Sequence, residues 1–159
     1  MLNCSFTGHR DVENGHINLV TDRLRRGIEY VYNEGCRNFL TGGAVGFDTM
    51  AAKEVILFRM SHTDVRLILV IPCKEQDKSW SCAQRDMYNY ILSMADEIVY
   101  TGEEYTPHCM KRRNMYLAKN CDVLICYLGR EMSGAGQTAR MAEGLGKRVY
   151  NIYPVSKNL

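Results

Sequence analysis

The amino-acid sequence predicts a single α/β domain over residues 1–159, with a doubly wound, Rossmann-like fold in which a mainly parallel sheet of about six strands is flanked by helices. Three observations lead to this prediction. Short apolar runs recur along the chain, helical patterns fill the intervals between them, and glycine-rich segments stand where several of the runs end. Since the sequence contains no internal repeat, low-complexity tract or linker, we expect one domain.

The expected strands are short runs that are apolar on both faces, which is typical of strands buried inside a parallel sheet. They comprise residues 3–7, 38–41, 65–71, 97–100, 122–128 and 148–152.

The expected helices fill the gaps between these runs. In the first gap the apolar residues recur every three or four positions and so share one helix face, formed by Ile17, Val20, Leu24, Ile28 and Val31. The third gap repeats the pattern with Trp80, Ala83, Met87, Ile91 and Met94. Shorter helices are expected after Gly46, Pro107 and Gly136, which gives about five helices in all.

The composition is that of an ordinary folded protein, with 46% apolar and 24% charged residues. The formal net charge of +2 is too small to indicate a nucleic-acid surface by itself. The first residues lack the apolar core of a signal peptide, and no apolar run approaches the roughly 20 residues that cross a bilayer. We therefore expect a cytoplasmic protein without a membrane partner.

The seven cysteines do not predict a metal site, because no pair of them has C-x-x-C spacing. Buried free thiols in a reducing compartment are the expected state. Cys73, after Pro72, is the one that is placed like a loop thiol, but no acid–base pair marks it as a nucleophile.

Unusual residues cluster at the ends of the expected strands, which is where ligands bind in doubly wound folds. Glycines at these junctions let backbone N–H groups approach an anion, and the following helix adds its partial positive charge. Turns also need glycine, but two such segments predict a cradle for the phosphate and sugar ends of one nucleotide-like ligand. The candidate binding residues in these places are Gly8, Arg10, Gly42, Gly43, Gly46, Asp48, Gly134, Gly136 and Thr138.

Two side chains near these glycines, Arg10 and Asp48, have two alternative roles each. Arg10 is either a fork for a phosphate or a surface arginine. Asp48 either accepts hydrogen bonds from ribose hydroxyls or caps a helix over residues 48–60. Thr138 is expected to donate its hydroxyl to the phosphate, whereas His9 is expected to be structural rather than catalytic.

The main basic cluster is Lys111, Arg112 and Arg113, at the start of an expected helix. Helical neighbours stand about 100° apart, so one arginine is expected to point into the pocket and the other into solvent. Asn114 is a candidate donor to a base edge or a phosphate. The alternative is a solvated basic helix start.

Five segments, in this order and over nearly the whole chain, resemble the SLOG superfamily of Rossmann-like proteins and in particular its YpsA-type family. They are FTGHR, TGGAVGFDTMAA, IPCKEQDKSW, RRNMYLAKNCDVLICYL and SGAGQTARMAEGLGKRVYNI. The residues most specific to that branch are Glu75, Gln76 and Trp80, together with the RRNM piece. The resemblance implies a protein that senses or processes a nucleotide derivative, ADP-ribose-like molecules included.

The related Lonely Guy family implies a nucleoside-monophosphate phosphoribohydrolase. Its arginine matches Arg113, nine residues before Asp122, which makes Arg113 the best catalytic candidate. The glutamate of its signature is replaced by Met141, and Glu143 lies about 200° further round the helix. Cleavage through a cationic transition state needs a carboxylate, so this activity is the less favoured reading.

The related DNA-processing protein A family implies binding of single-stranded DNA, since the glycine-to-helix element and the arginine–asparagine motif are similar. Such binding also needs a basic groove with stacking aromatic residues, which this composition does not plainly offer. Trp80 lies on an apolar helix stripe, so core packing is favoured over base stacking. DNA is therefore a lesser alternative.

The sequence thus predicts a nucleotide-derived ligand at the strand ends, with no cofactor established and the physiological role open. Loss of ligand binding is expected in Gly43→Asp and Arg113→Ala. The oligomeric state is left open: related families commonly pair as dimers, and the Met- and Tyr-rich helix at residues 87–94 is either the face of such a homodimer or core.

Overall fold

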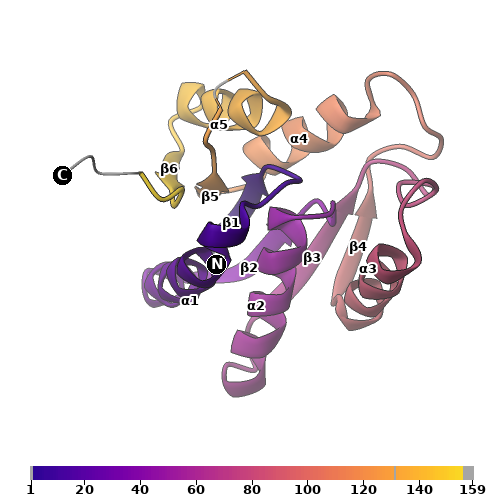
Figure 1. The fold of residues 1–159 in the computed structure, drawn as a ribbon. Helices are drawn as coiled ribbons and strands as arrows, with labels where there is room; N and C mark the ends of the chain where they lie inside the picture. Colours follow the sequence, from indigo (N-terminus) through magenta and orange to yellow (C-terminus); the bar gives the residue numbers. More distant parts are fainter. Residues whose placement is uncertain (1, 131, 156–159) are drawn as a thin grey trace.

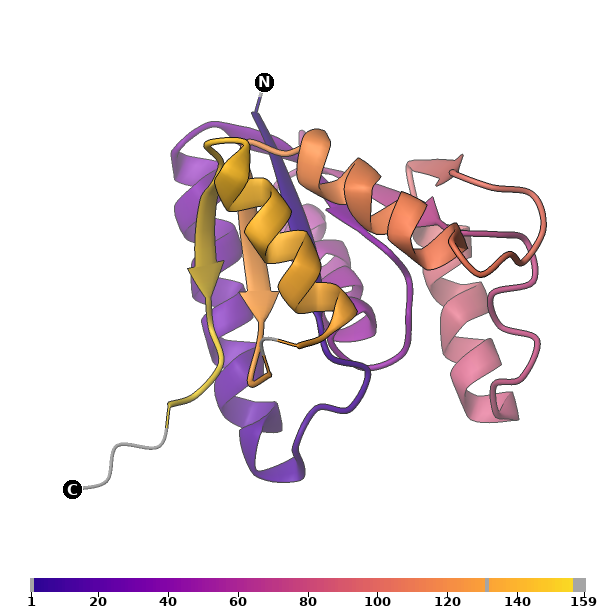
Figure 2. The same cartoon turned by 90° about the horizontal axis from the view of Figure 1, so that it is seen from above.

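The computed structural model describes residues 2–130 and 132–155, which form one parallel sheet of six strands with helices on both faces (Figures 1 and 2). The strand order is β4-β3-β2-β1-β5-β6, and every neighbouring pair is parallel. The predicted doubly wound α/β fold is confirmed.

The strands lie within two residues of the predicted boundaries. They are β1 (Leu2–Gly8), β2 (Cys36–Thr41), β3 (Arg66–Ile71), β4 (Glu97–Tyr100), β5 (Val123–Tyr127) and β6 (Arg148–Asn151). The inner strand β5 is buried throughout, whereas β4 and β6 at the two edges are mostly exposed. This difference explains why the central runs read as continuously apolar.

The helices are divided between the two faces of the sheet. They are α1 (Ile17–Asn33), α2 (Phe47–Ser61), α3 (Cys82–Met94), α4 (Cys109–Lys119) and α5 (Gly134–Gly144), with a 3-10 turn η1 at Asn14–His16. Figure 2 shows α4 and α5 together on one face and α1, α2 and α3 on the other. The larger core lies between the sheet and α1–α3, where the predicted stripe of α1 is buried at Val20, Leu24, Ile28 and Val31.

Two helices differ from the prediction. The helix after Gly46 is not short, because it runs from Phe47 to Ser61. In the third interval the helix begins only at Cys82, since Ser81 and Gln84 form a capping box there. Trp80 therefore precedes α3 and packs edge-on against Tyr88, with 5.0 Å between ring centroids. This contact agrees with the core reading of Trp80.

The topology fixes where a ligand can be held. From β1 the chain moves through β2 to one edge of the sheet, then returns to place β5 on the other side of β1. The connections leaving β1 and β5 therefore diverge, and a crevice opens beyond their carboxyl ends. No helix among the described residues has the length and apolarity that a membrane crossing needs.

Candidate functional site

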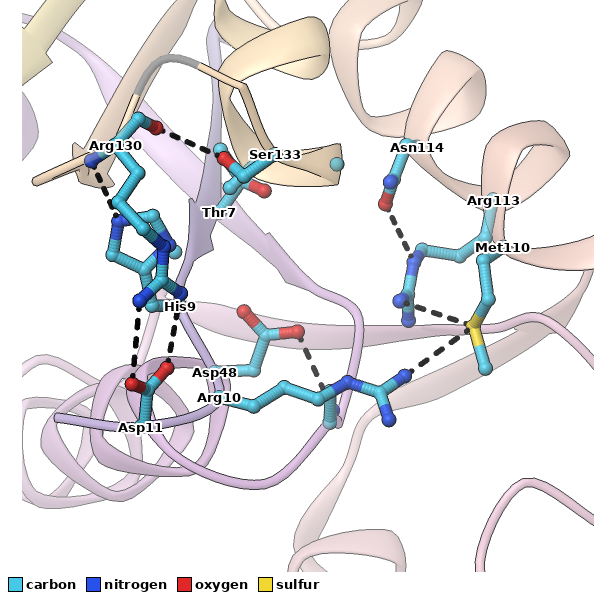
Figure 3. A pocket seen from close by; sticks show the side chains of 14 residues that line it. Thr7, His9, Arg10, Asp11, Asp48, Met110, Arg113, Asn114, Arg130 and Ser133 are labelled. Atoms are coloured by element: carbon cyan, nitrogen blue, oxygen red, sulfur yellow. Dashed lines mark hydrogen bonds and ion pairs between the residues drawn. The ribbon is translucent and has the colours of Figure 1, made fainter.

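A cavity of about 380 Å³ lies at this switch point between β1 and β5 (Figure 3). Its walls come from the end of β1, the β2–α2 loop and α2, the first turns of α4, and the segment between β5 and α5. The predicted residues that it brings together are Gly8, Arg10, Asp48, Arg113, Asn114 and Gly134. The lining residues that were not predicted as binding residues are Thr7, His9, Asp11, Ala44, Met110, Arg130, Ser133 and Ala135.

Two guanidinium groups converge on one side of the cavity. Arg10 and Arg113 each place an Nη2 atom near the Sδ atom of Met110, at 3.8 Å and 3.7 Å (Figure 3). A thioether is a weak acceptor. Within the described residues, neither arginine has a carboxylate within ion-pair distance. The two cations therefore leave strong donors available at the cavity.

Arg113 is held in place from behind. Its side chain is only 5% exposed, its Nη1 atom donates to the carbonyl oxygen of Gly42 at 2.6 Å, and its Nε atom donates to Oδ1 of Asn114 at 2.9 Å. Burial lowers the pKa of Arg113, and the neighbouring Asp48 acts in the opposite direction. Arg112, one residue earlier, is exposed and its Nη2 atom donates to Thr106. One arginine of the pair thus faces the cavity and the other faces solvent, as the helical spacing predicts.

Gly42, Gly43 and Gly46 of the β2–α2 loop do not line the cavity themselves, but two of them lie against its arginines. A Cβ atom on Gly42 would lie 2.2 Å from Nη1 of Arg113, so only glycine lets the guanidinium sit against the loop. Gly46 has a φ of 82°, and a Cβ atom there would lie 2.2 Å from the carbonyl oxygen of Arg10. A Cβ atom on Gly43 would lie 3.0 Å from Ile71 and 3.3 Å from Tyr88, neither of which lines the cavity. Direct contact of these glycines with a phosphate stays a prediction, but their packing positions both arginines.

Gly43 was predicted to belong to the phosphate cradle, but it does not line the cavity. The loss of ligand binding expected for Gly43→Asp therefore has a different cause. At Gly43 the φ of 68° already disfavours a side chain, and an aspartate would direct its carboxylate into the packing of Ile71. Gly43→Asp is therefore expected to act by disturbing the fold of the loop rather than by filling the cradle.

Asp48 lies in the first turn of α2 and is 6% exposed. Its Oδ2 atom accepts a hydrogen bond from the backbone N–H of Ala44 at 3.3 Å, which ties the glycine loop to the helix. Burial raises the pKa of Asp48 to about 6, although the charges of Arg113 and Arg10 lower it. The N-cap position belongs to Gly46, so Asp48 serves the loop and lines the cavity at the same time.

An Asp48→Asn variant is expected to gain stability relative to the native protein as the pH rises. The unfolded chain ionises near the ordinary value of 3.8 and the folded protein only near 6, so the stability contributed by this group is present below about pH 4 and is lost by about pH 6. Asparagine removes that loss. The gain in free energy of unfolding should be about 2 kcal/mol larger at pH 7.5 than at pH 4, because each pKa unit is about 1.4 kcal/mol.

Urea unfolding of both proteins at the two pH values measures this difference. Asp86→Asn, at an exposed position of α3, is the control for the loss of one charge. A gain that is the same at both pH values would show that Asp48 does not titrate in this range.

His9 joins the two connections that border the cavity. Its Nε2 atom accepts hydrogen bonds from the backbone N–H groups of Gly129, at 2.8 Å, and Arg130, at 3.2 Å. Burial lowers the pKa of His9, so the neutral ring that these bonds require is favoured. This geometry agrees with a structural role. Beside it, Arg130 pairs with Asp11 at 3.2 Å (Figure 3).

The first turn of α5 closes the cavity. Ser133 caps the helix, since its Oγ atom accepts from the N–H of Gly136 at 3.0 Å. Gly134 and Ala135 line the cavity, where the N–H groups of a first helical turn lack partners within the helix. Gly136 is buried, and the Thr138 hydroxyl donates to the carbonyl oxygen of Gly134 at 2.8 Å. The predicted phosphate bond of Thr138 stays a prediction and would require this bond to be exchanged.

The cysteines do not contribute a second reactive centre at this cavity. Cys82 is exposed, and the other six thiols are buried. Cys73, predicted to be a loop thiol, is among the buried ones, and burial raises its pKa. Its thiol is therefore less ionised than a free one.

Comparison with known proteins adds a family and a fold. The model of the YpsA family, described as the YspA SLOG family, matches residues 5–156. The uncharacterized SPbeta prophage-derived protein YoqJ of Bacillus subtilis (strain 168) is 29% identical over 140 residues, which cover 79% of this chain and 82% of YoqJ. A UPF0398 protein of Bacillus thuringiensis (strain Al Hakam) is 26% identical over 140 residues, covering 82% and 76% of the two chains.

Two solved structures share the fold. DNA processing protein A from Streptococcus pneumoniae superposes with a TM-score of 0.69 at 20% identity, over 99% of this chain and 52% of its own. The protein of the same name from Helicobacter pylori, whose structure is described for its single-stranded DNA binding mode, gives 0.68 at 17% identity, over 99% and 67%. This chain therefore spans about half of the first protein and two thirds of the second.

Proposed function

Because the chain belongs to the YpsA family of SLOG proteins, we propose that the cavity at its switch point binds the phosphate group of a nucleotide-derived ligand. One observation carries the proposal: the guanidinium groups of Arg10 and Arg113 converge at the cavity on the thioether of Met110, and neither has a carboxylate of the described residues within ion-pair distance. Two such donors beside a helix N-terminus are the chemistry that recognises a phosphate.

The energetics of Arg113 support an anionic ligand. A buried cation loses its hydration, and here the loss is large enough to lower the pKa of the guanidinium. Gly42 and Asn114 supply only neutral oxygens. A phosphate at the cavity adds a charged acceptor and offsets this loss, so ligand binding is expected to stabilise the fold as well.

Asp48 gives the cavity a second function beside phosphate binding. Its Oδ2 atom is engaged by Ala44, which leaves Oδ1 as an acceptor in the cavity. A carboxylate close to an arginine pair repels a phosphate but accepts hydrogen bonds from sugar hydroxyls. We place the ribose of the ligand at Asp48 and its phosphate at Arg10 and Arg113.

A thermal-shift comparison of AMP, adenosine and inorganic phosphate tests the proposal. AMP at about 100 times its dissociation constant should stabilise the fold by about 2.7 kcal/mol. Adenosine lacks the group that the arginines bind and should give little shift, while phosphate should give a smaller shift than AMP. An equal shift with adenosine and AMP would show that the arginines are not a phosphate site.

Single-stranded DNA is a second candidate, because the Helicobacter pylori protein that shares this fold is described as binding it. Arginines that hold one phosphate also suit a nucleic-acid backbone. A DNA site would give an affinity for a short oligonucleotide that falls steeply with salt concentration. The same oligonucleotide would then displace AMP.

Turnover separates a binding protein from a phosphoribohydrolase. Met141 stands where the Lonely Guy signature has its glutamate, and Glu143 is exposed. Asp11 and Asp48 are the carboxylates that line the cavity, and Asp11 is paired with Arg130. Release of free adenine from AMP that is abolished by Asp48→Asn would assign an enzyme with Asp48 as its carboxylate.

A further inference from the structure

The segment between β3 and α3 contains three residues that carry the resemblance to the family, Glu75, Gln76 and Trp80. None of them is among the described residues that line the cavity. Glu75 is exposed, and Trp80 packs on Tyr88. Gln76 is only 7% exposed, and a buried amide needs partners for both its donors and its acceptor. The contacts of Gln76 therefore show what this segment does.

The amide nitrogen of Gln76 reaches the loop that supports Arg113. Its Nε2 atom donates to the carbonyl oxygen of Gly42 at 3.4 Å, and the same oxygen accepts from Nη1 of Arg113 at 2.6 Å. A carbonyl oxygen has two lone pairs, so two donors from different elements can fix its direction. Gln76 is therefore connected to the buried cation of the site through one shared acceptor.

Gln76 is itself held by an aromatic side chain. A Cβ atom on Gly43 would lie 3.3 Å from Tyr88 and 3.6 Å from Nε2 of Gln76, so the two side chains meet at the loop. Burial raises the pKa of Tyr88 to about 12, and a hydrogen bond from Gln76 lowers it. Tyr88 in turn packs edge-on against Trp80. These three side chains form a chain of contacts from the start of α3 to Gly42.

The acceptor half of the Gln76 amide is not satisfied. Its Oε1 atom is buried and has no hydrogen-bond partner among the described residues. A buried oxygen without a partner destabilises a fold, and an apolar side chain of the same length would remove that cost. The stability of the fold therefore does not explain a glutamine at this position, whereas its hydrogen bond to Gly42 does.

Building on the proposed function, we infer that Gln76 is a positioning residue of the phosphate site. It fixes the carbonyl oxygen of Gly42, and that oxygen holds one edge of the Arg113 guanidinium. The other N–H groups of the guanidinium then keep their direction at the cavity before a ligand arrives. Without Gln76 the ligand must order both the loop and the arginine as it binds, which weakens binding.

A Gln76→Met variant tests this inference, because methionine keeps the length of the side chain and removes both its donor and its unpartnered oxygen. Titration calorimetry is expected to show that AMP binds about tenfold more weakly than to the native protein, while the melting temperature stays the same or rises. Loss of affinity and stability together would indicate a merely structural residue and overturn the inference. Glu75→Met, at the exposed neighbouring position, is the matched control and should change neither quantity.

A double-mutant cycle determines whether Gln76 acts through Arg113. In an Arg113→Lys background the new side chain cannot bond Gly42 and Asn114 as the guanidinium does. Adding Gln76→Met to that background should therefore weaken AMP binding less than twofold. A tenfold loss in both backgrounds would show that Gln76 acts independently of Arg113, and the inference would be wrong.

A measurement without ligand separates this inference from the proposed function. The Nε–H proton of Arg113 gives an NMR signal that is identified by its loss in Arg113→Lys. Its exchange with water is expected to be at least tenfold faster in Gln76→Met, because the guanidinium is held less firmly. Unchanged exchange would refute the positioning role whether or not AMP binds. Faster exchange in a protein that does not bind AMP would leave Gln76 as the positioning residue of Arg113 and refute the phosphate site.

Discussion

An Arg113→Ala variant is expected to bind AMP about 100-fold more weakly than the native protein. The guanidinium is the most deeply buried of the cations that line the cavity, and in the proposed site it is the donor of a charge-assisted hydrogen bond to the phosphate. A hydrogen bond to a charged group contributes about 1.5–3 kcal/mol, and a tenfold change in affinity is about 1.4 kcal/mol. Titration calorimetry with AMP measures the loss.

Three comparisons separate lost recognition from lost structure. Arg112→Ala removes the neighbouring arginine, whose side chain bonds Thr106 outside the cavity, and should leave the affinity unchanged. Arg113→Lys keeps the charge but cannot bond Gly42, Asn114 and a phosphate together, so an intermediate affinity is expected. Melting temperatures of all three variants report on the fold. An Arg113→Ala protein that is folded and binds AMP normally would refute the phosphate site.

The fold could be predicted because its signal lies in local patterns. Apolar residues on both faces of β5 and the three- or four-residue spacing in α1 each describe one element, and the alternation of elements describes the topology. The start of α3 could not be placed this way. Its position depends on the reciprocal bonds of Ser81 and Gln84, which override the apolar spacing that begins at Trp80.

Of the residues that line the cavity, the sequence allowed prediction only of those that lie near the ends of expected strands and helices. Arg10, Asp48 and Arg113 lie near expected strand or helix ends, and all three line the cavity. Met110 was missed because a methionine in a helix resembles a packing residue, and its contact with both arginines is made in three dimensions. Arg130 had a usable signal, since it follows β5 directly, but its pairing with Asp11 joins segments 119 residues apart.

The sequence also could not predict which neighbouring atoms surround each glycine of the β2–α2 loop. Gly42, Gly43 and Gly46 form one motif, yet they meet Arg113, Ile71 and the backbone of Arg10, respectively. A sequence motif shows that side chains are excluded but not what excludes them. This distinction matters at Gly46, where backbone rather than a side chain occupies the space.

A Gly46→Ala variant is expected to be destabilised by about 4 kcal/mol. The backbone at Gly46 has φ 82° and ψ −125°, a region that costs other residues about 1–3 kcal/mol. In addition, the new Cβ atom would lie 2.2 Å from the carbonyl oxygen and 2.5 Å from the carbonyl carbon of Arg10. The backbone must move to remove this overlap, which costs about 1–3 kcal/mol more. The free energy of urea unfolding measures the sum.

Two other glycines divide this cost into its parts. Gly146 has a similar φ of 79° but nothing within 4 Å of its Cβ position, so Gly146→Ala carries the backbone strain without the overlap. Gly144, at the end of α5, also has open space and has no positive φ, so alanine there should stabilise by up to about 1 kcal/mol. The excess loss at Gly46 over Gly146 measures the contact with the Arg10 backbone together with any difference in strain that comes from ψ.

Since relief of that contact displaces Arg10 from the cavity, Gly46→Ala should also weaken AMP binding, whereas Gly146→Ala should not. Equal losses of stability in the two variants would show that the segment after β1 moves away from the new Cβ atom at little energetic cost. That segment would then not hold Arg10 in position.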